Sequence, residues 1–190
     1  HPAATVDIRS LTSRAIQNAL DTFEIDGGVT YLENEPLEHV RRIPLYRERY
    51  VFVCGPRHPL AERQSVTWTE AAEQRLCLLT EDMQNRRIID AVFSTLGAKV
   101  RPVIISNSFL ALASHLRTGM LCGIVPHTFF HVVGRSDELL PIRLIEPFHS
   151  QLIGLVLSDR DPQSPMTGAL VRAVRDADFE GSFAGAGHAA

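Results

Sequence analysis

The chain has 190 residues, of which 45% are hydrophobic and 22% are charged, and its formal net charge is −3. These values are typical of one large globular domain or of two small domains that share a cleft. They argue against direct nucleic-acid binding, which relies on clustered Lys and Arg, and no apolar run or secretory leader indicates a membrane or export signal.

The three cysteines lie far apart, and each of them is part of an apolar run: Cys54, Cys77 and Cys122. Because no CxxC pair exists, the sequence indicates neither a zinc knuckle nor a redox motif. We predict that all three are small buried residues of a protein in the reducing cytoplasm.

Hydrophobic periodicity predicts strands that alternate with helices from the start of the chain. Ser13 follows the first strand and is predicted to cap a helix that carries Ile16, Leu20 and Phe23 on one face. The strands predicted in the first third are residues 3–9, 29–32, 44–46 and 50–54.

The middle third repeats this pattern. Thr67 is predicted to cap a short helix, and Asp82 a longer one that ends at Gly97. A third helix over residues 109–116 would end at Gly119. The strands predicted here are residues 76–80, 103–106 and 121–125.

In the last third, strands are predicted over residues 139–145 and 151–157. Ser164 and Pro165 then form a helix start with proline at its first position. The Gly- and Ala-rich residues 181–190 are predicted to be a disordered tail. Strands that alternate with helices imply parallel sheets with crossover helices, and therefore an α/β fold.

Residues 20–30, 44–53, 58–61 and 117–126 contain motifs that together resemble the effector domains of LysR-type transcriptional regulators. Residues 20–30 (LDTFEIDGGVT) resemble the end of the family's first helix–strand unit. Residues 44–53 (PLYRERYVFV), followed by HPLA at 58–61, and residues 117–126 (RTGMLCGIVP) resemble two further family segments. Each motif has low specificity, but their order matches the family over roughly residues 2–179.

The resemblance implies two Rossmann-like subdomains joined by two crossover strands, as in type 2 periplasmic binding proteins. Subdomain I would comprise residues 1–49 and 149–180, and subdomain II residues 50–148. The family's winged helix-turn-helix and linker helix have no counterpart in this sequence. The first strand and helix of the sensing domain are also missing, so the chain is expected to be an N-terminally truncated effector domain.

The implied function is sensing of a small metabolite, with an anionic one as a candidate, in the cleft between the subdomains. The effector would control DNA binding or transcription by the missing winged helix-turn-helix, in a homo-oligomer that is a dimer or tetramer. No cofactor and no membrane contact are expected. The alternatives are a solute-binding protein of a transporter with the same fold, and an enzyme such as a dehydratase.

Candidate effector-binding residues follow from the topology, because ligands bind beyond the carboxyl ends of parallel strands, where helices begin. The turn at residues 80–85 is the most informative, since it offers two side-chain amides and the adaptable thioether of Met83. The predicted effector-binding residues are Ser13, Tyr31, Thr80, Met83, Gln84, Asn85, Ser106, Asn107, Ser108 and His127.

Less specific explanations exist for several of these residues. Arg86 and Arg87 lie in the first turn of a predicted helix, where the interaction with the helix dipole destabilises each positive charge by about 0.3–1 kcal/mol. An anionic effector bound at this helix start would make the same charges favourable. Both could equally point into solvent, with Asp82 acting only as a cap. Ser13 and Ser108 could likewise be simple caps, and Tyr31 a partly buried core residue.

Signatures of metal binding and catalysis are weak. His127 and His131 are four residues apart, but a zinc site needs three or four converging ligands, and neither Cys nor an acid lies nearby in sequence. The sequence contains no GxSxG elbow, Walker A loop or strand-linked GxGxxG. Acidic pairs such as Glu33 and Glu35 fit solvated loops better than a catalytic dyad. We therefore predict neither a metal site nor an enzyme.

Overall fold

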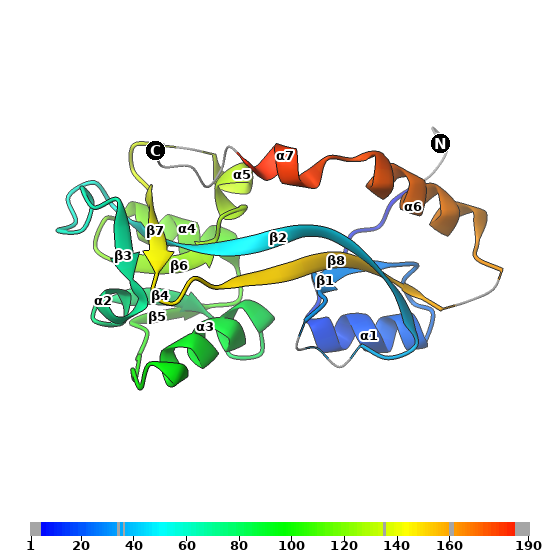
Figure 1. The fold of residues 1–190 in the computed structure, drawn as a ribbon, viewed down its shortest axis with the longest axis horizontal. Helices are drawn as coiled ribbons and strands as arrows, with labels where there is room; N and C mark the ends of the chain where they lie inside the picture. Colours follow the sequence, from blue (N-terminus) through cyan, green and yellow to red (C-terminus); the bar gives the residue numbers. More distant parts are fainter. Residues whose placement is uncertain (1–4, 34, 36, 135, 160–161, 185–190) are drawn as a thin grey trace.

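Two long antiparallel strands join two lobes of an elongated molecule (Figure 1). The computed structural model describes residues 5–184 apart from residues 34, 36, 135, 160 and 161. The joining strands are β2 (Val40–Cys54) and β8 (Ser150–Ser158). The two lobes therefore share backbone hydrogen bonds, and no flexible linker separates them.

The strand β2 changes its partners between Arg49 and Tyr50. Its first ten residues pair with β8, from Val40 opposite Ser158 to Arg49 opposite Ser150. From Tyr50 onward it pairs with β6 (Cys122–Pro126), and from Val51 with β7 (Leu140–Ile145). In the first lobe, β1 (Gly28–Tyr31) lies on the other side of β8 and completes a three-stranded antiparallel sheet.

The second lobe contains the parallel strands expected from the alternating pattern. β4 (Leu76–Leu79) lies between β5 (Ile104–Ser106) and β6 and is parallel to both. The short β3 (Ser65–Thr67) is parallel to β7. The carboxyl ends of β4, β5 and β6 consequently meet at one edge of the sheet, close to the point where β2 changes partners.

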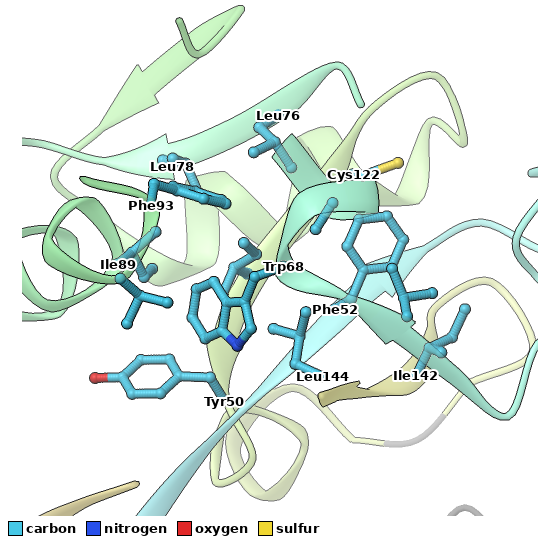
Figure 2. Packing of buried hydrophobic residues seen from close by; sticks show 14 of the residues in the cluster. Tyr50, Phe52, Trp68, Leu76, Leu78, Ile89, Phe93, Cys122, Ile142 and Leu144 are labelled. Carbon is cyan, nitrogen blue, oxygen red and sulfur yellow. The ribbon is translucent and has the colours of Figure 1, made fainter. Parts of the chain in front are cut away.

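Helices cover both faces of this second sheet. α2 (Trp68–Ala72) and α3 (Gln84–Thr95) pack on one face, and Trp68 lies in the middle of their hydrophobic cluster with Phe52 and Leu144 (Figure 2). α4 (Phe109–Arg117) and α5 (Phe129–Val133) pack on the other face, against Val51 and Val53. Strand alternation explains this division, because Phe52 points to the opposite face from its two neighbours.

The first lobe is smaller. α1 (Ser13–Asp21) packs through Ile16 and Leu20 against Val156 of β8. α6 (Pro165–Asp176) packs through Val171 against Leu155 and Leu157. A few apolar side chains thus hold each helix against the sheet.

Several predicted helix ends are confirmed. The Thr67 hydroxyl accepts a hydrogen bond from Glu70 N, and the Glu70 carboxylate accepts one from Thr67 N, which together make a capping box. Ser108 and Ser164 cap α4 and α6. Gly97, with φ of +67°, ends α3 in the left-handed conformation that glycine adopts readily.

Two predicted caps are wrong by one residue. Thr12, and not Ser13, caps α1 by accepting a hydrogen bond from Ala15 N. Asp82 does not cap α3 either, because the N-cap is Met83, which makes no side-chain cap bond. A hydroxyl or carboxylate next to a helix start can therefore indicate the helix without being its cap.

The strand predictions need two corrections. Residues 5–9 form no strand, and Val6 and Ile8 are 76% and 88% exposed, because no neighbouring strand pairs with this segment; residues 3 and 4 lie outside the described residues. The separate segments 44–46 and 50–54 are parts of the single strand β2. A register shift between Pro44 and Tyr46 accommodates the proline, which has no N–H for a sheet ladder.

The prediction of a disordered tail from residue 181 is wrong for residues 181–184, and residues 185–190 lie outside the described residues. A further helix, α7 (Phe179–Ala184), runs along β2 in the view of Figure 1. Phe179 and Phe183 pack against the ring of Tyr46, and Glu180 accepts a 2.9 Å hydrogen bond from Arg47 N. These anchors outweigh the Gly- and Ala-rich composition on which the prediction rested.

Candidate functional site

The carboxyl ends of β4 and β5 bring several predicted site residues together. Thr80 N donates a 3.0 Å hydrogen bond to Ser106 O, so the two strand ends are adjacent. Ser106 Oγ accepts a 3.2 Å hydrogen bond from Ser108 N, and Ser108 caps α4. Asn107 is exposed. The polar edge expected from the sequence therefore exists, although its serine groups mainly organise the turn itself.

The start of α3 carries two buried amides with different roles. Gln84 and Asn85 are only 8% and 4% exposed. Gln84 Oε1 accepts a 2.6 Å hydrogen bond from Arg87 Nε, so it is already used within the helix. Neither Nδ2 nor Oδ1 of Asn85 has a partner among the described residues. Met83, half-buried, packs against the cluster beneath α4.

The two arginines that follow do not extend freely into solvent. Arg86 is buried and donates to Asp90 Oδ1 at 2.8 Å and to Leu79 O at 3.0 Å. Arg87 donates at 3.0 Å to Glu35, whose carboxylate is almost fully buried. Both guanidinium groups are therefore neutralised by acids of the chain, and the expectation of an anionic effector loses the residues on which it depended.

The first lobe contributes two predicted residues. Ser13 is buried at the start of α1, and its Oγ accepts a 2.9 Å hydrogen bond from Thr30 Oγ1. Tyr31, at the end of β1, donates a 2.7 Å hydrogen bond to Glu48 Oε1 and packs against the hydrophobic cluster of the second lobe. Ser13 thus holds its own lobe together, whereas Tyr31 reaches the boundary between the lobes.

Three buried residues of the joining strands are not among the predicted site residues. Glu48, Tyr50 and Gln151 are 5%, 4% and 4% exposed. Glu48 and Gln151 are direct cross-strand partners, so their side chains share one face with Tyr50. The alternation of Tyr46, Glu48 and Tyr50 along one strand face was the available signal, but residues 47–49 were not included in either of the two predicted strands.

Several buried polar atoms of this region have no hydrogen-bond partner among the described residues. They are Tyr50 Oη, Thr80 Oγ1, Asn85 Nδ2 and Oδ1, and Gln151 Oε1. The Tyr50 hydroxyl is close enough to Tyr31 and Asn85 for each to affect its ionisation, yet neither contact has hydrogen-bond geometry. We call Tyr31, Glu48, Tyr50, Thr80, Asn85 and Gln151 the junction cluster.

Glu48 is the charged group of this cluster. Burial raises its pKa from 4.5 to about 7, and the hydrogen bond from Tyr31 offsets only part of that effect. No Lys or Arg of the described chain forms an ion pair with it. Burial, and then the nearby Glu48 charge, raise the pKa values of Tyr31 and Tyr50, so both hydroxyls stay protonated as donors.

His127, the last predicted residue, joins β6 to β2. It is 3% exposed. Its ring Nδ1 accepts a 3.1 Å hydrogen bond from Arg49 N, and its backbone N–H donates a 2.8 Å hydrogen bond to Arg49 O. Burial and the Arg49 charge lower its pKa, which keeps the ring neutral. Within the described parts of the chain, no group of three His, Cys, Asp or Glu side chains is placed to hold a metal.

The family model of the LysR substrate binding domain matches residues 1–178. The chain belongs to this family. LysR substrate-binding domains are regulatory, so the regulator is favoured over the transporter component, and the resemblance identified from the motifs is confirmed. No helix of the described residues has the length and apolar character needed to span a membrane.

Solved structures show the same fold at low sequence identity. The CcmR regulatory domain of Synechocystis PCC6803, in complex with 2-PG, has a TM-score of 0.81 at 15% identity, covering 94% of this chain and 86% of that one. The QuiR effector binding domain, in complex with shikimate, has a TM-score of 0.71 at 20% identity, covering 86% and 76%. The predicted fold of the type 2 periplasmic-binding-protein kind is thereby confirmed.

A longer relative is a Corynebacterium glutamicum OxyR C206 mutant, with a TM-score of 0.74 at 19% identity. The match covers 92% of this chain but only 55% of that one. The chain therefore spans about half the length of this LysR-family regulator.

Proposed function

We propose that this LysR substrate-binding domain senses a small polar metabolite at the junction cluster. The observation that carries the proposal is the set of buried polar atoms without partners on Tyr50, Thr80, Asn85 and Gln151. An unsatisfied buried polar group costs about 1–3 kcal/mol, and native proteins retain few of them. A ligand with several hydroxyl or amide groups would satisfy these atoms.

The position of the cluster supports a regulatory role. Its residues come from β1 of the first lobe, from the joining strands β2 and β8, and from α3 and the turn between β4 and α3 of the second lobe. The change of β2 partners after Arg49 supports subdomain boundaries at 1–49 with 149–180, and at 50–148. A ligand held by both subdomains favours one of their relative arrangements, and this differential affinity is what transmits a signal.

The proposal extends to the intact regulator. The ligand would control DNA binding or transcription through a winged helix-turn-helix outside this chain, in a cytoplasmic homodimer or homotetramer. An enzymatic role is not proposed, because the buried acid Glu48 is bonded to Tyr31 and is not paired with a second acid–base group.

The cluster also restricts the ligand. The group that faces Glu48 should be a hydrogen-bond donor such as a hydroxyl or an amine, because a second carboxylate would be repelled there. An anionic group elsewhere on the ligand would be received by the backbone N–H groups where α3 and α4 begin, since Arg86 and Arg87 are engaged with acids. The other predicted site residues would contact the ligand only at the edge of the site or would position the residues that bind it. They are Ser13, Met83, Gln84, Ser106, Asn107, Ser108 and His127.

Calorimetric titration with a panel of polar metabolites, beginning with shikimate and 2-PG, tests the proposal. Asn85→Ala should weaken saturable binding by about tenfold or more, because it removes two hydrogen-bonding atoms. Asn18→Ala, at an exposed position on α1, is the matched control and should bind like the wild type. Equal affinity of the Asn85→Ala variant and the wild type would overturn the assignment of the site.

A further inference from the structure

We propose that the domain has a second ligand site, a pocket for a small carboxylate or phosphate group where β7 gives way to β8 beside β2. The side chains that would carry this site are Arg49, Arg143, His127, His149, Trp68 and Phe148. We call it the arginine pocket. It borders Tyr50 but has a different chemistry from the junction cluster, and the proposal does not depend on the function proposed for that cluster.

The fold brings the basic side chains together from distant parts of the sequence. Arg143 on β7 lies directly opposite Val51 in the β2–β7 register. Arg49 is two residues before Val51 and therefore shares its face of β2. His127 is bonded to the main chain of Arg49 on the other side of the strand. Arg49, Arg143 and His127 thus lie at one level of the sheet, and all three line the pocket.

The charge of this pocket is not balanced by the chain. Neither Arg49 nor Arg143 has a side-chain hydrogen bond or ion pair with any described residue, and no described Asp or Glu lines the pocket. Glu48 is next to Arg49 in sequence, but it is not among the lining residues and its carboxylate accepts the hydrogen bond from Tyr31. Glu180 and Glu33, whose charges act to raise the pKa values of His127 and His149, lie outside the lining.

The histidines add neutral donors. Burial lowers the pKa values of both His127 and His149, so the rings are uncharged near neutral pH. Because His127 Nδ1 accepts a hydrogen bond from Arg49 N, the ring proton is on Nε2. An oxyanion in the pocket would therefore meet guanidinium groups, which bind such anions with two parallel hydrogen bonds, together with neutral N–H donors.

The size of the pocket limits what enters it. Its cavity is about 40 Å³, enough for the oxyanion group of a ligand but not for a whole metabolite. The exposed ring of Phe148, at the rim, would contact the remainder of the molecule. The ligand is therefore a small anion or a molecule that inserts one carboxylate or phosphate.

The fluorescence of Trp68 can report binding at this site. Trp68 is the single tryptophan of the sequence, it lines the pocket, and its Nε1 donates a 3.0 Å hydrogen bond to Pro147 O in the turn above. Fluorescence and calorimetric titrations of the 190-residue chain with sodium phosphate and sodium acetate, at ionic strength held constant with chloride, would test the proposal. The two salts distinguish a preference for phosphate from one for carboxylate.

Saturable binding of at least one of the two anions is expected. Arg143→Gln, at an exposed position on β7 that should not disturb folding, should weaken that binding by about tenfold or more. Arg101→Gln, an exposed arginine away from the pocket, is the matched control, and Asn85→Ala should leave anion binding unchanged even where it abolishes metabolite binding. Absence of saturable heat with both anions, or an unchanged affinity in Arg143→Gln, would overturn the second site.

Discussion

The hydroxyl of Tyr31 donates a 2.7 Å hydrogen bond to Oε1 of Glu48 across β8, the strand that separates them. This contact places a carboxyl group, without a cationic partner among the described residues, at the boundary between the two lobes. The buried acid and its phenolic donor should therefore affect both stability and ligand binding, and their contributions can be measured separately.

Glu48→Gln should reduce the pH dependence of stability. Unfolded chains ionise this carboxyl near pH 4.5, whereas in the native state burial raises its pKa to about 7. The contribution of this group to native-state stability is therefore fully present below pH 4.5 and is lost as the pH rises through 7, by about 2–3 kcal/mol between pH 5 and pH 8. Urea unfolding at these two pH values should show this loss in the wild type and a smaller one in the variant.

The exposed Glu62 provides a control for this measurement. Glu62→Gln should retain the wild-type difference between pH 5 and pH 8. If Glu48→Gln retained it as well, the proton uptake would have to be assigned to another group.

Arg86→Met should destabilise the domain by about 1–3 kcal/mol in chemical denaturation, because Leu79 O and Asp90 lose their donor inside the lobe. Arg86→Lys should recover part of the loss, since it keeps the charge but not the forked geometry. Wild-type stability of the Met variant would contradict a structural role for this side chain.

Gly154→Ala should destabilise the first lobe by about 1–3 kcal/mol. A Cβ atom at this position would lie 2.4 Å from Leu32 Cδ1 and 2.7 Å from Ile43 O, and the backbone oxygen cannot move aside cheaply. Gly168→Ala in α6 is the contrasting variant, because only Arg172 Nη1 lies near its Cβ position, at 3.6 Å. It should stabilise the chain by about 0.5–1 kcal/mol, and a thermal melt of both variants should give shifts of opposite sign.

Glu180→Ala should expose the outer edge of β2. Glu180 Oε1 accepts a hydrogen bond from Arg47 N, so its removal should accelerate amide exchange at Arg47 and cost about 0.5–1.5 kcal/mol. Glu180→Gln keeps an acceptor oxygen and should exchange almost like the wild type. Equal protection of the Arg47 amide in all three proteins would indicate that α7 does not hold this edge in solution.

The fold was largely predictable because local patterns specify its parts. The helix starts at Thr67, Ser108 and Ser164 each combine a capping side chain with a following apolar stripe, and the structure confirms them. The caps expected at Ser13 and Asp82 were wrong because a one-residue shift changes little in the local pattern. Residues 5–9 have the composition of a strand, but a strand forms only beside a partner, which composition does not reveal.

The candidate site was predictable only in part. The turn that contains Thr80 and Asn85 could be found because strand-to-helix turns mark ligand edges in parallel sheets. Glu48 and Gln151 could not be found in this way, because their burial arises from the pairing of β2 with β8, about a hundred residues apart. Arg86 posed the opposite problem, since its own burial and its hydrogen bond to Leu79 O arise only when α3 packs on the sheet.

The uninterrupted course of β2 determines how the two lobes can move relative to each other. Its 15 residues belong to both sheets, and the pairing with β8 continues up to the point where the pairing with β6 begins. Rotation of one lobe therefore cannot be absorbed by a few loop torsions, and it must be distributed as extra twist along two hydrogen-bonded strands. We therefore expect a ligand that contacts both lobes to produce a small twist of β2 and β8 and not a large hinge opening.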